Sequence, residues 1–241
     1  MKFSILSFLS LLLFVACDKK ETNGNLHITG NIKGLKKGTL YIQKIVDTSL
    51  VVVDTIKIDG NSNFVSNLEI KSPEMYYLFL DRGVTNSLDN NLSFFAEAGN
   101  ITIETSLDYF LSDSKITGSK NQDKYDEFKK VIARFNDENL TLMENKFRAY
   151  KNKNSKKVDS IETKQNTNLK RRYLYVTNFA LNNKDFEIAP YLALSEIADI
   201  NLKYLDTIEK AMTPKVAQSI YGKKLKKFLD ERMKLEGKQI N

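Results

Sequence analysis

The sequence predicts an α+β protein in which an N-terminal antiparallel β-sandwich-like domain is followed by a C-terminal helical domain. Between Leu26 and Ile116 apolar residues recur at every second position, and Gly, Asn, Asp and Pro interrupt them at short intervals. This alternation is typical of half-buried strands joined by turns. After Gly118 the apolar residues move to spacings of three and four, and glycine does not recur until Gly222. That change predicts helices in the second half of the chain.

Short strands account for the first half of the predicted fold. Turn residues separate them at Lys37-Gly38, Asp59-Gly60-Asn61, Ser72-Pro73 and Gly99-Asn100. Because no helical segment lies between the strands, an antiparallel sandwich or open barrel is expected. The predicted strands are Leu26–Ile32, Thr39–Ile45, Leu50–Ile58, Phe64–Ile70, Met75–Leu80, Leu92–Phe95 and Ile101–Thr105.

Helices are predicted from Ser119 onward. Ser119 with Gln122 three residues later fits a capping box. The helix that follows carries an apolar face that includes Leu140, Met143 and Phe147. This apolar face is interrupted near Asn136-Asp137. Further helices are expected over Ser155–Leu181, Tyr191–Ile200 and from Thr213-Pro214 to about Leu235, where Pro suits a first turn.

The first 16 residues have the layout of a secretory signal peptide. Lys2 supplies a positive charge, the run from Phe3 to Val15 is apolar, and small Ala16 precedes Cys17. This run is shorter than the roughly 20 residues that a membrane-spanning helix needs. Phe14-Val15-Ala16-Cys17 resembles the bacterial lipobox, which implies that Cys17 is acylated and becomes the mature N-terminus. An ordinary signal peptide with an incidental cysteine is the alternative.

These signals divide the chain into five segments. Residues 1–16 are the signal peptide, 17–25 the lipidated cysteine and a polar tether, 26–117 the β-sandwich-like domain, 119–236 the helical domain and 237–241 a tail. The lipid on Cys17 would hold the protein on a membrane of the cell envelope, since two or more acyl chains anchor a protein stably. The outer membrane, with the protein facing the periplasm or the cell surface, is the expected location.

Composition limits the chemistry that the protein can perform. The chain has 241 residues with one His, one Cys and no Trp, and a net charge of +7. A zinc site built from His and Cys, or a dithiol centre within the chain, is therefore not expected. Basic clusters near Lys151–Lys157, Lys170–Arg172 and Lys223–Lys227 are typical of solvated helix faces. Nucleic acid is not an expected partner of an exported protein, whereas anionic lipid or an acidic partner is.

The candidate catalytic residues each have a simpler structural interpretation. His27 has no spaced partner, so a solvated position at a strand edge is favoured over a ligand or general base. Glycoside hydrolysis would require Glu97 to face the carboxylate of Asp81 or Asp89. Turn positions are favoured for all three residues. Asp59–Asn63 resembles the start of a calcium loop but lacks its Gly and Glu, which favours a hairpin turn. No catalytic residue, metal site or cofactor is predicted.

Several short strings in both halves of the chain form a recognisable set: Ile28–Ile32, Gly38–Ile42, Val53–Ile56, Pro73–Leu78, Phe94–Ile101, Thr117–Asn121, Ala189–Leu194 and Ser219–Leu225. Together they resemble the uncharacterised N-terminal β-domain of Bacteroidota lipoproteins that precedes a thioredoxin-like domain of the AhpC/TSA or TlpA type. The resemblance implies a β-domain, a helical segment and an envelope location. It also implies a Cys-x-x-Cys domain soon after Gly237, but the chain ends at Asn241 without this motif, so thiol-disulfide exchange is not expected.

The sequence therefore predicts a membrane-anchored lipoprotein that acts as a non-catalytic binding or scaffolding module. The alternative is an accessory subunit that docks a separate thioredoxin-like protein. An envelope partner or a second copy is expected on the helical half, because the final predicted helix carries an apolar face that needs cover. Its residues are Val216, Ile220, Leu225, Phe228, Leu229 and Met233.

Overall fold

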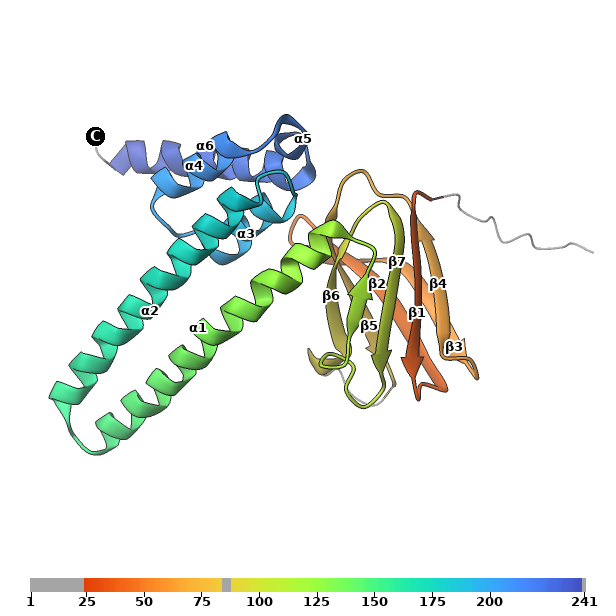
Figure 1. Ribbon diagram of the computed structural model, residues 1–241, viewed down its shortest axis with the longest axis horizontal. Helices are drawn as coiled ribbons and strands as arrows, with labels where there is room; N and C mark the ends of the chain where they lie inside the picture. The colour runs from red at the N-terminus through yellow and green to blue at the C-terminus, as the bar shows by residue number, and fades with distance from the viewer. Residues whose placement is uncertain (1–23, 84–87, 240–241) are drawn as a thin grey trace, which may run out of the picture.

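The computed structural model describes residues 24–83 and 88–239 and shows a β-sandwich joined at one end to a group of helices (Figure 1). The two sheets lie within residues 26–117 and the helices follow from residue 120, which confirms the predicted α+β class. In these described ranges, no helix combines the length and the apolar character that crossing a membrane requires. The predicted lipidation site, Cys17, lies outside the described residues.

Eight strands form the two four-stranded sheets of the sandwich. All the strand pairs are antiparallel except β1 with β7, which run parallel with Leu26 beside Gly99. The first sheet has the order β4-β1-β7-β8, with bounds Asn63–Leu68, Leu26–Lys33, Gly99–Ser106 and Lys115–Thr117. The second has the order β3-β2-β5-β6, with bounds Ser49–Asp59, Lys37–Val46, Glu74–Asp81 and Asn91–Ala96, and a 3-10 turn, Leu88–Asn90, precedes β6.

The alternating sequence pattern places one face of each sheet in the sandwich core. In β1, Leu26, Ile28 and Ile32 are fully buried while the intervening His27 is exposed. Gly30 falls on the buried face, where the ring of Phe64 lies so close that a Cβ would meet it at 2.4 Å. A larger residue at Gly30 would therefore displace Phe64 from the core.

The turn after β3 differs from the predicted hairpin. Asp59 ends β3 and Asn63 begins β4, but β4 pairs with β1 and not with β3. The segment from Asp59 to Asn63 therefore crosses from one sheet to the other at the edge of the sandwich. Gly60 has a φ of +86°, which glycine adopts without the strain that a side chain would introduce.

Two long helices form an arm that projects away from the sandwich (Figure 1). Helix α1 spans Lys120–Lys151 and α2 spans Ser155–Asn182. Helix α1 is continuous through Asn136-Asp137, where its apolar face was predicted to be interrupted. At this point the apolar residues move to another face of the helix, as described below.

Four further helices pack at the base of the arm: α3 (Ile188–Glu196), α4 (Leu202–Ala211), α5 (Pro214–Ala217) and α6 (Ile220–Gln239). Helix α4 was not predicted, and the last predicted helix is divided into α5 and α6. The division occurs because Ser219 closes the turn, its Oγ accepting a hydrogen bond from the N–H of Gly222 at 3.1 Å.

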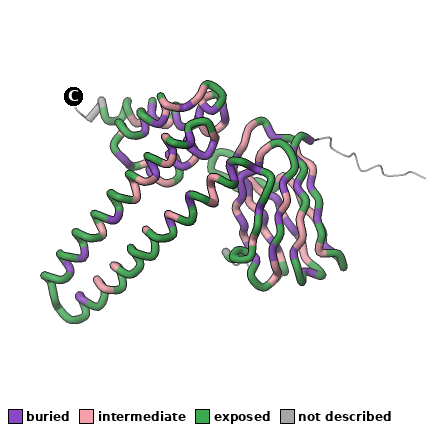
Figure 2. The backbone as a smooth tube through the Cα atoms, viewed as in Figure 1, coloured by how far each residue is buried: buried purple, intermediate pink, exposed green. Residues whose placement is uncertain are grey.

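The base helices and the sheet share a second core. Met75 of β5 and Phe95 of β6 are buried against Phe128, Leu192 and other apolar residues of the helices. Figure 2 shows that burial is concentrated in the sandwich and at the base of the helices, whereas the outer part of the arm is mainly exposed. The base helices are thus fixed to the sandwich, and the arm extends from a rigid support.

Candidate functional site

Glu97 holds the start of α1 against the turn between β6 and β7. Its Oε2 accepts hydrogen bonds from the Oγ of Ser119 at 2.9 Å and from the backbone N–H of Asn121 at 3.2 Å. The carboxylate therefore lies at the positive end of the helix dipole, where negative charge is stabilising. Ser119 also caps the helix, since its Oγ accepts from the N–H of Gln122 at 3.1 Å. The predicted cap at Ser119 is confirmed, but the side chain of Gln122 accepts from the N–H of Phe95 and not from that of Ser119, so the second half of the predicted capping box is not formed.

Asn121 joins this junction to α3. Its Nδ2 donates to Oε2 of the buried Glu187 at 2.9 Å, and its Oδ1 accepts from the N–H of Ile188 at 2.9 Å. Lys215 approaches the other oxygen of Glu187 at 3.8 Å. Both acidic side chains at the junction are thus engaged in holding helix ends together.

Asp81 and Asp89 lie at the other end of the sheet from Glu97. Glu74 pairs with Ala96 across β5 and β6, so Asp81 and Glu97 are separated by the length of these strands, about 20 Å at 3.3 Å per residue. Paired catalytic carboxylates are about 5–10 Å apart, so Glu97 forms no such pair with either aspartate. Asp81 is the last residue of β5 and pairs with Thr39, so its predicted turn position is wrong, although its Oδ1 accepts from the N–H of Gly83 in the turn that follows at 2.7 Å.

The remaining candidate, His27, lies exposed on β1. Its Nδ1 is 2.8 Å from Oδ1 of Asn67. β1 lies between β4 and β7, so the predicted position at a strand edge is wrong, although the exposure of the ring was predicted. In the ranges that the structure describes, no group of three or more His, Cys, Asp or Glu side chains could hold a metal ion.

An aromatic cluster fills the junction between the sheet and the base helices. The rings of Tyr191 and Tyr221 have centroids 5.1 Å apart, and Phe95 contacts both. The Oη of Tyr221 accepts a hydrogen bond from the N–H of Met75 at 2.9 Å. Burial raises the pKa of both tyrosines above its usual value, so each phenol keeps its proton at alkaline pH values where an exposed tyrosine ionises. The cluster stabilises the junction through edge-to-face contacts.

The apolar face predicted for the last helix is largely covered by the chain itself. Val216 and Leu225 are fully buried, Leu229 is 3% exposed and Phe228 packs against the same core. Met233 and Leu235 near the end of α6 are largely exposed, at 47% and 63%. Most of the predicted face is thus covered by the chain itself, and a further group of exposed apolar side chains in the helical half lies on the arm.

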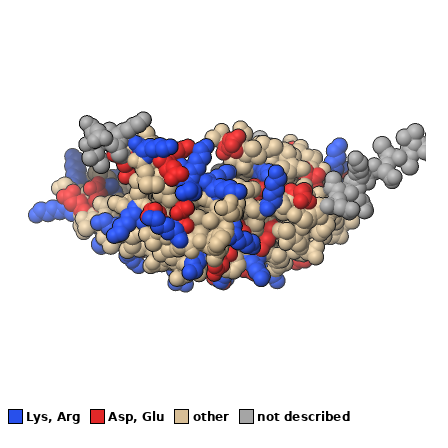
Figure 3. Space-filling model, turned by 90° about the horizontal axis from the view of Figure 1, so that it is seen from above, with Lys and Arg blue, Asp and Glu red and all other residues tan. Residues whose placement is uncertain are grey.

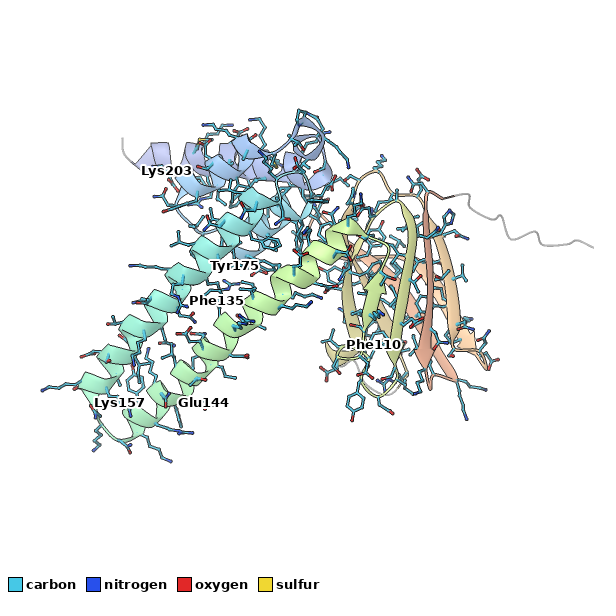
Figure 4. All side chains as sticks on the ribbon, in the orientation of Figure 1. Phe110, Phe135, Glu144, Lys157, Tyr175 and Lys203 are labelled. Atoms are coloured by element: carbon cyan, nitrogen blue, oxygen red, sulfur yellow. The ribbon has the colours of Figure 1, made fainter. Side chains whose placement is uncertain are left out.

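The two helices of the arm pack against each other along a seam, in which the contacting residues of each helix recur at alternating spacings of three and four. Near the base, Phe128 and Phe135 of α1 pack against Tyr175 of α2, with ring centroids 5.8 and 5.9 Å apart; Figure 4 labels Phe135 and Tyr175 in this region. Near the tip, Leu142 and Ala149 pack against Val158 and Ile161. This seam has the repeat of an antiparallel coiled coil.

A second apolar row on α1 lies beside the seam. Its members are Leu140, Met143, Phe147 and Tyr150, which we call the α1 stripe, and their exposures are 58%, 53%, 70% and 58%. At the tip of the arm its last member, Tyr150, lines a pocket together with Val158 and Asp159 of α2. Spacings of three, four and three place all four residues on one helix face. Exposed apolar residues gathered in this way are typical of interaction sites, whereas scattered ones are not.

The sequence prediction assigned Leu140, Met143 and Phe147 to the same face as Phe128 and Phe135. The step from Phe135 to Leu140 is five residues, which breaks the repeat of three and four and moves the apolar row to a face beside the seam. This five-residue step is the sequence signal that distinguishes the α1 stripe from the seam.

Charged side chains are mixed over the surface. On the face shown in Figure 3, Lys and Arg side chains lie among Asp and Glu side chains. In the arm, Lys146 pairs with Glu162 at 2.8 Å and Arg171 with Glu138 at 3.5 Å, each joining α1 to α2. The basic cluster Lys170–Arg172 on the arm therefore includes residues that pair with acidic neighbours, since Arg172 also pairs with Glu196.

Residues 26–125 match the model of a protein family described as a domain of unknown function, DUF4369. The match covers the whole sandwich and the first turns of α1. The comparisons with curated proteins and with solved structures gave no match. The sandwich thus has the sequence features of an uncharacterised domain family, and the arm beyond residue 125 lies outside the match.

Proposed function

We propose that the protein is a lipoprotein of the cell envelope that acts without catalysis as a binding or scaffolding module, and that the arm formed by α1 and α2 carries its binding surface. The observation that supports this most directly is the α1 stripe. A partner that covered these four large apolar side chains would gain about 25 cal/mol of binding free energy for each Å² of apolar surface removed from water.

The signal layout that ends at Cys17 supports the membrane anchor. The described structure begins at Gly24, just before β1, so the tether enters the sandwich at the end where the helices are attached. The arm runs away from this end (Figure 1), which would leave the α1 stripe accessible to partners at a distance from the membrane.

The polar groups of the junction support a non-catalytic role. Glu97 and Glu187 accept hydrogen bonds from Ser119 and Asn121, and the buried tyrosines are packed among apolar side chains. These groups hold the arm and the sandwich together. Substitutions in them are expected to alter stability.

Two measurements test the proposal. Cys17→Ser should move the protein from the membrane fraction to the soluble fraction, and retention in the detergent phase would contradict lipidation at this residue. Cross-linking in envelopes should give a Phe147-dependent adduct that Phe147→Asp abolishes. Val65→Asp is the matched control, because Val65 is 59% exposed on β4 and far from the arm.

The resemblance of the sequence to β-domains that precede thioredoxin-like domains suggests a second candidate function, about which the description of the matched family says nothing. On this alternative, the protein is an accessory subunit that docks a separate thioredoxin-like protein. An exported Cys-x-x-Cys protein recovered in the same cross-linked adduct would favour it. An adduct that contains no redox protein would favour the simple scaffold.

A further inference from the structure

The start of the described chain lies close to the start of α6. The side chain of Asn25 holds Ile70, because its Nδ2 donates to the backbone oxygen of Ile70 at 2.8 Å and its Oδ1 accepts from the N–H at 2.9 Å. Two residues further on, the Oγ of Ser72 accepts from the N–H of Ile220, the first residue of α6, at 3.2 Å. The β4–β5 loop therefore connects the end of the tether to α6, and both lie on the upper side of Figure 1.

The length of the tether limits how far this end of the molecule can lie from the membrane. In the proposed function the lipid is attached to Cys17, which precedes Gly24 by seven residues. Even a fully extended chain of that length spans no more than about 25 Å, at 3.3–3.6 Å per residue. The end of the sandwich that carries Asn25, and the start of α6 beside it, must therefore lie near the membrane surface.

Basic side chains are concentrated at this same end. Between Thr213 and Leu229 the chain has five lysines and no Asp or Glu, and Lys71 adds a further positive charge from the β4–β5 loop. Figure 3 views the molecule from this side and shows Lys and Arg side chains spread across it. We call the group the basic end; its members are Lys71, Lys215, Lys223, Lys224, Lys226 and Lys227, all of them exposed.

The acidic residues of the described chain neutralise the basic end only weakly. The three ion pairs formed here are long, at 3.8–4.0 Å, and the lysine side chains in them are 65–79% exposed; they are Lys215–Glu187, Lys226–Glu209 and Lys227–Glu231. Lys146 on the arm, by contrast, lies 2.8 Å from Glu162 and is 27% exposed. Within residues 24–83 and 88–239 no acidic side chain forms an ion pair with Lys223 or Lys224.

The lysines are also unfavourably placed for the helix itself. Helix α6 has no acidic residue in its first turn, where negative charge would be stabilising. Lys223 and Lys227 are four residues apart, and like charges at this spacing repel each other. The positive end of the helix dipole adds to the same potential. An anionic surface opposite the start of α6 would relieve both effects.

We infer that the basic end lies on the anionic headgroups of the membrane that holds the Cys17 anchor. This inference rests on the proposed function and deepens it, because it names a second attachment and the orientation of the protein. An acyl anchor combined with a basic patch gives firmer membrane binding than either alone. The arm runs away from this end in Figure 1, so it projects from the membrane.

Vesicle binding without the lipid anchor tests the charge contact. Residues 18–241 contain the whole described structure and lack the apolar run Phe3–Val15, which would itself bind lipid. At low ionic strength this chain should co-sediment with vesicles of phosphatidylglycerol mixed with phosphatidylcholine, and not with phosphatidylcholine alone. Added salt should weaken the binding. No preference for the anionic vesicles would overturn the inference.

Charge reversal at the start of α6 tests which lysines make the contact. Lys223→Glu combined with Lys224→Glu should weaken binding to the anionic vesicles about tenfold or more. The matched control is Lys156→Glu combined with Lys157→Glu, which changes the charge equally at two adjacent exposed lysines; Figure 4 labels Lys157 at the outer end of the arm. The control should leave the affinity within about twofold. Equal losses would show that net charge and not the basic end sets binding, and would overturn the inference.

The two double variants should remain folded. All four lysines are exposed, and glutamate near the start of α6 favours the helix. Circular dichroism of both variants should therefore match that of the parent chain, so that a loss of vesicle binding reports on the contact.

Amine labelling of the lipidated native chain tests the orientation. With a water-soluble amine reagent, Lys223 and Lys224 should react at least about threefold more slowly in vesicles that contain phosphatidylglycerol than in phosphatidylcholine alone. Lys156 and Lys157 should react alike in both. Mass spectrometry of the digested protein measures each site.

The outcomes separate this inference from the proposed function. A lipidated chain in which Lys223 and Lys224 react equally in both kinds of vesicle would overturn the inference and leave the anchor in place. A native chain that is absent from the membrane fraction would overturn the anchor at Cys17 and, with it, this orientation.

Discussion

The backbone N–H of Phe95 donates a hydrogen bond to Oε1 of Gln122, with 2.8 Å between nitrogen and oxygen. Phe95 lies in β6, an outer strand of its sheet, and Gln122 lies in the first turn of α1. Both residues are fully buried. One side chain of the helix therefore supplies an acceptor that a neighbouring strand would otherwise provide, and attachment of the arm completes the hydrogen bonding of the sheet.

Gln122→Met is expected to lower the free energy of unfolding by about 1–3 kcal/mol, because the buried N–H of Phe95 loses its acceptor while the side-chain volume is kept. Urea denaturation followed by circular dichroism measures the change. The control is Gln218→Met at an exposed position, for which a change within about 0.5 kcal/mol is expected. Equal effects of the two substitutions would show that this bond does not hold the junction.

Gly118 connects β8 to α1 under two constraints. Its φ is +101°, and a Cβ would lie 1.9 Å from the backbone oxygen of Asn100. Gly118→Ala is therefore expected to cost more than about 3 kcal/mol, because both the backbone conformation and the overlap are unfavourable. Thermal unfolding of the purified protein measures the loss.

Gly60 offers a control that separates these two constraints. Its φ is +86°, but a Cβ there would meet no atom within 4 Å. Gly60→Ala should therefore cost only about 1–2 kcal/mol, the conformational part alone. A loss for Gly118→Ala no greater than for Gly60→Ala would mean that β7 moves away from the junction without cost.

The buried tyrosines make the junction sensitive to alkaline pH. Burial raises the pKa of Tyr191 in the folded protein, and nearby Tyr125, Tyr77, Tyr221 and Glu196 raise it further. In the unfolded chain tyrosine ionises near its ordinary pKa of about 10. Above that pH the unfolded state loses a proton that the folded state keeps, so stability is complete below pH 10 and falls as the pH rises beyond it.

Tyr191→Phe should therefore flatten the decline in stability above pH 10 while changing stability at pH 7 by less than about 1 kcal/mol, since no bonded backbone group depends on its hydroxyl. Unfolding midpoints in urea measured from pH 7 to 11 test this. Tyr109→Phe, at an exposed residue outside the junction, should keep the parental pH dependence. If both variants decline alike, burial of Tyr191 does not set the alkaline limit.

The strands of the sandwich could largely be predicted from the sequence, because the alternation of residues within each strand shows which of its faces is buried. The alternation of Leu26, Ile28 and Ile32 with exposed neighbours is visible without knowledge of the fold. The pairing of strands is not local. The parallel pair of β1 and β7 and the crossing at Gly60 depend on which edges are free after the sheets form, which periodicity does not reveal.

The packing of the helical half was harder to predict, because residue spacing identifies an apolar helix face but not the element that packs against it. The residues of α6 and those of the α1 stripe have similar spacing in the sequence. In the structure Leu225 is covered by the base helices, whereas Phe147 lies beyond their reach on the arm. The difference comes from the length of the α1–α2 hairpin, a tertiary feature.

The last prediction concerns Asn168, a polar residue in the seam of the arm. Asn168 is 4% exposed, and its Nδ2 donates to the backbone oxygen of Phe135 at 2.9 Å. Among the described residues its Oδ1 has no hydrogen-bond partner. A single polar residue in such a seam fixes the alignment of the two helices at a cost in stability.

Asn168→Leu is expected to raise the free energy of unfolding by about 1–2 kcal/mol, because the unpaired buried oxygen is removed and apolar surface is buried in its place. Hydrogen exchange of the amides of α1 and α2 should slow by a corresponding factor, while exchange in the sandwich stays the same. Asn166→Leu, at an exposed position two residues away, should change neither. A loss of stability in Asn168→Leu would instead mean that the bond to Phe135 outweighs the unpaired oxygen, and that the polar contact stabilises the arm as well as aligning it.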